Sequence, residues 1–318
     1  MLRTLAGIAG SAVLLGFLIH KVDPARLAEV LRQARPGFLA LAVASSGGAL
    51  ALVAVRWHLM LWLRGMSGPF RHSGRTTLVG YVLTLVLPGA MFGDFGKSVD
   101  HARRHRRPLA ELLLVCGLDR FAGLVGLAVY VLMVGVVAVP AASLGDLTSR
   151  WEWTLKFRWW WIPAAVAAAG AGWVALRSVR GRAGIIRAGH LARNGWDSLR
   201  ERPHLLIFAT GLSVLANLCV AGTLAFGLAG VAAPGLPWMR ILWTLPLIGL
   251  AAAFPFTVAG AGAREGAAIV LWSACGVPAL VAVAACLITL AANLSWAAVG
   301  AVLLFQAPPK PRGGHAVD

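Results

Sequence analysis

The sequence predicts an all-α, polytopic integral membrane protein with about six full transmembrane helices and two broken, re-entrant segments in an inverted repeat. Only 13% of the residues are charged and mean hydropathy is +0.77, whereas a soluble domain carries about 25% charged residues. Five long runs contain no Asp, Glu, Lys or Arg, and these are 37–55, 121–139, 159–176, 205–233 and 266–309. About 20 apolar residues cross a bilayer as a helix. Because the runs do not alternate apolar and polar residues, a β-barrel is excluded.

Six apolar segments are expected to cross the membrane, at about 4–20, 37–63, 109–139, 159–178, 204–233 and 278–305. The first lacks a small-x-small cleavage motif, so we expect it to be a retained helix and not a signal peptide. Gly and Pro interrupt two further apolar segments, 76–96 and 241–263. We predict a single transmembrane domain over 1–305, with halves at about 37–139 and 204–305, and a disordered tail over 306–318.

Loop charges predict the orientation. Arginine and lysine are concentrated in loops 64–75, 97–107 and 177–203, and cytoplasmic loops carry such an excess. Segment 76–96 then enters and leaves by the same face, which makes it re-entrant. Both termini are predicted to be cytoplasmic in a multi-pass protein of the cell (inner or plasma) membrane. Loop 21–36 falls outside although it carries four cations, so its side is left open.

The net charge of +17 predicts membrane lipids as partners, with anionic or phosphate-bearing headgroups. The cations lie in short loops between apolar runs, which favours lipid headgroups over nucleic acid. The four cysteines lie singly, and His101 and His105 have no accompanying ligand set. No nucleotide-binding or hydrolase motif is present. The sequence therefore predicts a protein that is not an enzyme and needs no cofactor or metal.

The two interrupted segments share the pattern P-x4-G-x3-[KR]. The first runs from Pro88 to Lys97 and the second from Pro255 to Arg264. Pro and Gly break a helix, and such breaks survive at membrane depth only when they are buried in protein or line a wet cavity. Three predicted helices separate the copies, so the second is inverted, and paired broken segments of this kind point to a transporter binding site. Hinges are predicted at Pro88, Gly89, Gly93, Pro255, Gly260 and Gly262. Two ordinary short loops are the alternative interpretation.

Ionisable residues in or beside membrane segments are functional candidates. Those that flank the repeat or interrupt an apolar run form the predicted substrate-binding site: Asp94, Lys97, Asp119, Arg120, Arg264 and Glu265. Cations here suit a phosphate, and nearby carboxylates would keep them oriented. Structural ion pairs are the alternative, including one between Asp119 and an arginine of a neighbouring helix. Arg56 is expected to reach toward headgroups. Gly117, Gly123 and Gly126 are expected at close helix contacts.

Several spaced motifs resemble the flippase-like membrane family named after the transmembrane region of lysylphosphatidylglycerol synthase. They are the stretch from Leu87 to Lys97, the run Asp119 to Gly123, the stretch from Pro255 to Gly266, and Arg56-Trp57. The resemblance covers nearly the whole chain and implies movement of lipids or lipid-linked molecules between leaflets. Phe92 stands where the family usually has Gly, and Lys97 where it often has Arg. No soluble catalytic domain follows Phe305, so synthase activity is not implied.

Together these observations predict a lipid translocase that moves a phospholipid or lipid-linked molecule between leaflets. Lys97 and Arg264 would receive a lipid phosphate near the midplane, with Asp94 and Glu265 as orienting or proton-coupling partners. Asp119 and Arg120 would line the polar path. Two alternatives stay open: a non-catalytic membrane subunit of a lipid- or glycolipid-modifying pathway, and an ion-coupled solute transporter. The lipid substrate, direction, energy coupling, oligomeric state and need for an enzyme partner are not predicted.

Overall fold

The computed structural model describes residues 24–86, 90–138, 200, 202–252 and 260–305. Within these ranges the chain forms helices only. In chain order they are α2 (Pro24–Arg32), α3 (Pro36–Leu63), α4 (Phe70–Val86), α5 (Ala90–His105), α6 (Leu109–Ala138), α11 (Pro203–Val231), α12 (Trp238–Ala252), α13 (Ala263–Ser273) and α14 (Ala279–Phe305).

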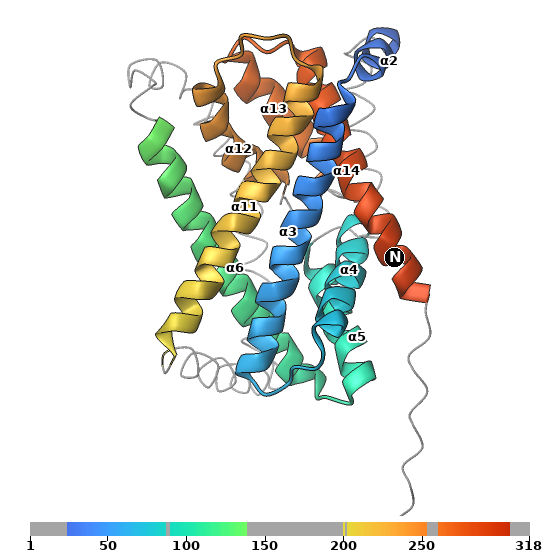
Figure 1. Ribbon diagram of the computed structural model, residues 1–318, viewed down its shortest axis with the longest axis vertical. Helices are drawn as coiled ribbons and strands as arrows, with labels where there is room; N and C mark the ends of the chain where they lie inside the picture. Colours follow the sequence, from blue (N-terminus) through green and yellow to red (C-terminus); the bar gives the residue numbers. More distant parts are fainter. Residues whose placement is uncertain (1–23, 87–89, 139–199, 201, 253–259, 306–318) are drawn as a thin grey trace, which may run out of the picture.

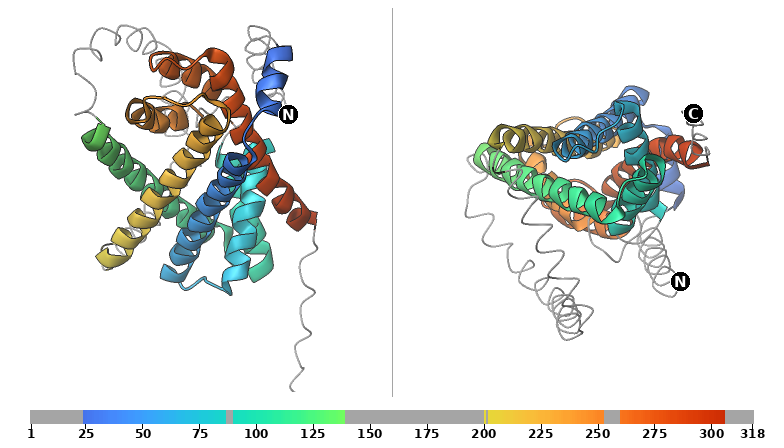
Figure 2. Two further views of the ribbon diagram at one scale, coloured as in Figure 1. Left: turned by 45° about the horizontal axis from the view of Figure 1, so that its top comes forward. Right: turned by 90° about the horizontal axis from the view of Figure 1, so that it is seen from below.

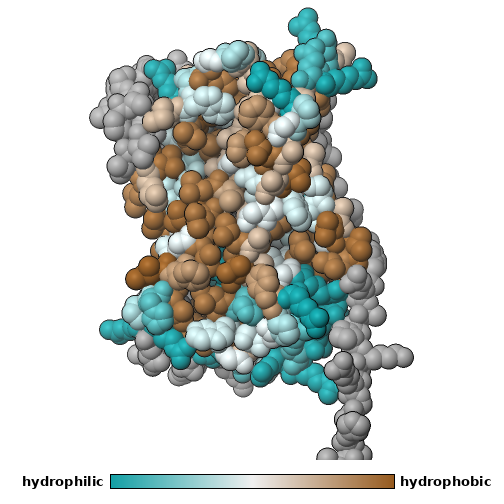
Figure 3. All heavy atoms as spheres, in the orientation of Figure 1, coloured by the Kyte–Doolittle hydropathy of each residue, from teal (hydrophilic) through white to brown (hydrophobic). Residues whose placement is uncertain are grey.

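Four helices are long and apolar enough to cross a membrane: α3, α6, α11 and α14. Proline begins α3 and α11, where its missing N–H costs nothing because the first turn has no helical acceptor. Of the described helix pairs, α3 and α11 contact each other most extensively, and they run side by side in both views of Figure 2. Apolar residues cover the middle of the face in Figure 3, while hydrophilic residues gather at its lower end and on α2. The chain is therefore a multi-pass membrane protein.

Two pairs of shorter helices lie at opposite ends of the molecule. Helices α4 and α5 pack together in the lower part of Figure 1, and α12 and α13 lie in its upper part. Helix α4 ends at Val86 and α5 begins at Ala90, while α12 ends at Ala252 and α13 begins at Ala263. Pro88, Gly89 and Pro255, three of the predicted hinges, lie outside the described residues.

Gly93 was expected to break its segment, and this expectation is wrong. It lies inside α5, where a Cβ would fall 1.8 Å from Thr84 Oγ1 and 2.5 Å from the carbonyl oxygen of Gly80. Gly93 is thus required for the close approach of α5 to α4. Gly260 and Gly262 have φ of +73° and +86°, a left-handed conformation that glycine adopts without a Cβ penalty. These two residues form the turn that leads into α13.

The other predicted elements agree in part. The expected helices at 37–63, 109–139, 204–233 and 278–305 coincide with α3, α6, α11 and α14 to within a few residues. The expected helices at 4–20 and 159–178 and the tail at 306–318 lie outside the described residues. Gly126 packs against Ser213 of α11 and Gly123 faces the Arg56 guanidinium, whereas a Cβ at Gly117 would meet nothing within 4 Å. The close contact expected at Gly117 is therefore absent.

Candidate functional site

Asp119 of α6 is the centre of a buried ionic network. It is 2% exposed, and its Oδ1 accepts a hydrogen bond from Arg56 Nε at 2.7 Å while Oδ2 accepts one from Lys97 Nζ at 3.2 Å. Arg56 also donates to Ser213 Oγ of α11 at 2.8 Å. Three helices thus meet at one carboxylate, and Arg56 connects a fourth, α11, to the network. A buried charge is tolerated only when it is paired and hydrogen-bonded, and Asp119 meets that condition with both oxygens.

Lys97 of α5 has three partners. Besides Asp119, its Nζ lies 3.8 Å from Asp94 Oδ1 and 3.9 Å from the centroid of the Trp57 ring. The Trp57 indole N–H donates to Thr76 Oγ1 of α4 at 3.2 Å, which fixes the ring. Lys97 is 5% exposed, and its ammonium is held by two carboxylates and an aromatic face. This arrangement orients the cation before any ligand arrives.

Asp94 also pairs with Arg120 of α6, whose Nε donates to Asp94 Oδ2. The two carboxylates differ in position: Asp119 is enclosed, and Asp94 lies between Lys97 and Arg120. The Arg120 side chain is 51% exposed, against 6% for Lys97. Arg120 is consequently the outermost cation of this group.

The second half presents a comparable pair at the start of α13. Arg264 Nη2 donates to Glu265 Oε1 at 3.1 Å, and Glu265 Oε2 accepts the Gly262 N–H at 2.6 Å. Glu265 is fully buried. A carboxylate in the first turn satisfies an orphan backbone donor and interacts favourably with the helix dipole. Glu265 therefore anchors the turn and orients Arg264.

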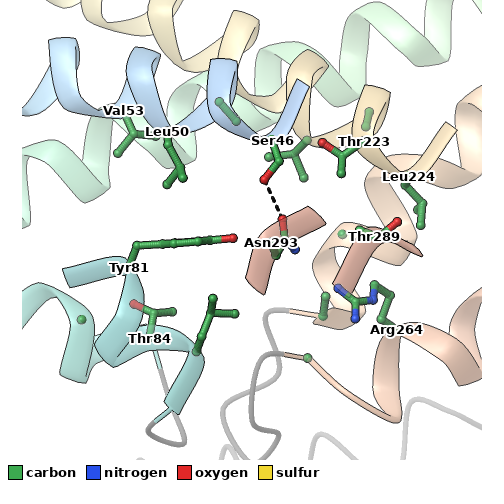
Figure 4. Close-up of a pocket in the computed structure, with 18 of the residues that line it drawn as sticks. Ser46, Leu50, Val53, Tyr81, Thr84, Thr223, Leu224, Arg264, Thr289 and Asn293 are labelled. Carbon is green, nitrogen blue, oxygen red and sulfur yellow. Dashed lines mark hydrogen bonds between the residues drawn. The ribbon is translucent and has the colours of Figure 1, made fainter. Parts of the chain in front are cut away.

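A cavity of about 430 Å³ lies between the two halves. Its charged lining residues are Asp94, Lys97, Arg120 and Arg264, its neutral polar ones are Ser46, Thr77, Tyr81, Thr84, Thr223, Thr289 and Asn293, and the rest of its walls is apolar side chains and glycine. Figure 4 shows Tyr81 extending from α4 toward Asn293 of α14, with Arg264 on another wall. Ser46 Oγ donates to Asn293 Oδ1 at 2.8 Å. Three cations and one carboxylate thus face a space whose walls are mostly apolar, with hydroxyl and amide groups among them.

The structure places the six predicted site residues in two ways. Asp94, Lys97, Arg120 and Arg264 line the cavity, whereas Asp119 and Glu265 are absent from its walls and lie behind the cations they hold. The expectation that Asp119 lines the path is therefore wrong, because its two oxygens are enclosed by Arg56 and Lys97. Arg56 does not reach toward headgroups either, since it is 8% exposed and bonded to Asp119. The ion pair of Asp119 with an arginine of a neighbouring helix is present.

Sequence reasoning missed the neutral part of the lining. Tyr81 and Asn293 are isolated polar side chains in apolar segments. An uncharged polar residue in a membrane helix needs a partner inside the protein, so each was a usable signal. Among the described residues, no group of three His, Cys, Asp or Glu side chains is arranged to hold a metal ion.

The family comparison agrees with the motifs. The profile of the family described as "Lysylphosphatidylglycerol synthase TM region" matches residues 4–300, which is nearly the whole chain. The chain belongs to this family. Membership agrees with the apolar membrane-crossing helices and with a lipid-related role at the membrane. No curated protein matches the sequence significantly. The charged residues that line the cavity are therefore the candidate functional site of this family member.

Proposed function

We propose that this protein moves a phospholipid or lipid-linked molecule between the two leaflets, without itself catalysing a covalent step. The observation that supports this most directly is the shared cavity, into which the first half contributes Lys97 and the second half Arg264. A lipid needs only its headgroup to cross through protein, because its hydrocarbon chains stay in the bilayer. A cavity between apolar helices that offers charged and polar side chains to the headgroup is the minimum requirement for that path.

The cavity favours a phosphate-bearing headgroup. Lys97, Arg120 and Arg264 face the space with Asp94 as the one carboxylate on its walls, because Asp119 and Glu265 are enclosed behind their partners. Charge-assisted hydrogen bonds to phosphate are roughly twice as strong as neutral ones. With Arg56, Asp119 and Glu265 behind the wall included, four cations stand against three carboxylates, and this excess of one positive charge attracts an anion and opposes a headgroup whose only charge is positive.

The helix pairs fit an inverted repeat of two re-entrant hairpins. Lys97 lies in α5, the second helix of its pair, and Arg264 lies in the first turn of α13, the second helix of the other pair; the two pairs lie at opposite ends of the molecule. Each half also has a buried tryptophan–threonine hydrogen bond, from Trp57 of α3 to Thr76 of α4 and from Trp272 of α13 to Thr244 of α12. In such an arrangement the site is reached from either side in turn. The excess of arginine and lysine in the loops favours the cytoplasmic side for the α4–α5 end and for both termini, in a protein of the cell membrane.

Leaflet exchange in proteoliposomes tests the proposal. Purified protein is reconstituted with a trace of fluorescent phosphatidylglycerol, and the outer-leaflet label is reduced with dithionite. Wild-type protein should expose label from both leaflets faster than protein-free vesicles, and Arg264→Gln should slow the exchange. Equal rates in protein-containing and empty vesicles would remove the translocase proposal. That result would favour a non-catalytic subunit, whereas uptake of a water-soluble substrate without lipid exchange would favour a solute transporter.

A further inference from the structure

A second hollow lies on the outer side of α5 and α6. It measures about 780 Å³, and its apolar lining residues are Phe92, Phe95, Leu113, Cys116 and Gly117. Phe92, Phe95 and Leu113 are 47%, 50% and 41% exposed, although large apolar side chains normally avoid water. Because α6 is long and apolar enough to cross a membrane, these exposed apolar side chains are suited to contact with hydrocarbon. We call it the α5–α6 groove.

The groove and the central cavity share two lining residues, Asp94 and Arg120. These two are ion-paired, and the Arg120 side chain is half exposed while that of Asp94 is 21% exposed. Lys97 and Arg264 line only the central cavity. The Asp94–Arg120 ion pair thus lies where an apolar groove and a cationic cavity adjoin.

We infer that the α5–α6 groove holds a hydrocarbon chain of a phosphate-bearing lipid, and that the Asp94–Arg120 pair is the gate through which the headgroup enters the central cavity. The inference rests on the proposed function. The occupant follows from the lining: aromatic and aliphatic walls suit a chain, and the guanidinium at their edge suits the phosphate attached to it. A soluble phosphate would gain nothing from the apolar walls.

When the Asp94–Arg120 gate opens, each of its two residues has another charged partner available. If Arg120 exchanges Asp94 for a lipid phosphate, it keeps charge-assisted hydrogen bonds of the same kind. Asp94 does not become isolated, because Lys97 Nζ already lies 3.8 Å from its Oδ1. Opening therefore replaces the Asp94–Arg120 pair with a pair between Arg120 and the phosphate, keeps the Asp94–Lys97 pair, and leaves no charge without a partner.

Filling the groove tests the inference. Gly117 lies on α6 at the groove wall with no atom within 4 Å of a Cβ, and Gly135 on the same helix is equally open but lines neither hollow. Gly117→Leu would displace about two methylenes of a bound chain, a loss of about tenfold in occupancy. We expect leaflet exchange about tenfold slower in Gly117→Leu and unchanged in Gly135→Leu. Equal rates in the two variants would contradict the inference that a lipid chain occupies the α5–α6 groove.

Photocrosslinking separates this inference from the proposed function. Phe95→benzoylphenylalanine places a reactive group in the groove, and Leu132→benzoylphenylalanine places one on α6 at a residue 68% exposed and outside it. In phosphatidylcholine vesicles, phosphatidylglycerol should be captured in preference to diacylglycerol at Phe95 and without preference at Leu132. Arg120→Gln should abolish the preference.

The outcomes are distinct. Exchange without selective capture at Phe95 would retain the translocase and overturn the groove, leaving only surrounding lipid at that position. Selective capture without any leaflet exchange would retain the groove as a lipid site and remove the translocase proposal.

Discussion

Lys97 of α5 places its ammonium 3.2 Å from Asp119 Oδ2 of α6, and the two residues are 5% and 2% exposed. The other Asp119 oxygen receives Arg56. One carboxylate therefore compensates two buried cations and joins three helices. This relationship gives the ionic network a structural role in addition to its place behind the cavity.

Asp119→Asn should destabilise the protein strongly. The variant leaves Arg56 and Lys97 buried with less negative charge, and removing one partner of a buried ion pair costs about 3–5 kcal/mol. Thermal unfolding in detergent, followed by size-exclusion fluorescence, measures the loss. Glu111→Gln on the same helix is the matched control, because Glu111 lies in the first turn of α6, where a charge contributes about 0.3–1 kcal/mol. Equal melting temperatures for the two variants would contradict the network.

Gly93→Ala should separate α5 from α4. The new methyl would fall 2.5 Å from the Gly80 carbonyl oxygen, and that backbone atom cannot rotate away as a side chain does. A lower melting temperature is expected. Gly74→Ala on α4 provides the control, since a Cβ there meets nothing within 4 Å and alanine is favoured over glycine in a helix by about 1 kcal/mol. The prediction fails if Gly93→Ala melts as high as Gly74→Ala.

Acidification should destabilise the end of the molecule that carries His101, which lies outside the four membrane-crossing helices. Burial, followed by the neighbouring His105, lowers the pKa of His101 to about 4. The folded state then binds fewer protons than the unfolded state, so stability falls as the pH drops below the ordinary histidine value, until the folded pKa is reached. Melting temperatures measured from pH 7 to pH 4 test this. The decline should be smaller in His101→Gln than in His204→Gln, which changes an exposed histidine; equal declines would contradict it.

The sequence predicted the four membrane-crossing helices that the structure describes, because the length of an apolar run is a local property. The pairing of Asp119 is not a local property of the sequence. Its partner Arg56 lies 63 residues away, and only the packing of α3 against α6 decides that they bond to each other and that Asp119 is withdrawn from the cavity wall.

Gly93 marks a second limit. Its spacing from Pro88 is the same as that of Gly260 from Pro255, yet Gly260 forms a turn with positive φ and Gly93 lies within a helix against Gly80. The same residue type serves conformation in one half and close packing in the other. Sequence spacing alone does not distinguish these roles, because both require only the absence of a side chain.

The central claim is that a lipid headgroup passes through the cavity between Lys97 and Arg264, and filling that cavity tests it most directly. Gly249 of α12 lines the cavity with no atom within 4 Å of a Cβ, and Gly266 of α13 is equally open but lies outside it. The measurement is the leaflet-exchange rate of fluorescent phosphatidylglycerol in vesicles containing Gly249→Leu or Gly266→Leu. We predict that Gly249→Leu slows exchange while Gly266→Leu retains the wild-type rate. Wild-type exchange in Gly249→Leu, in a protein that folds normally, would contradict the account.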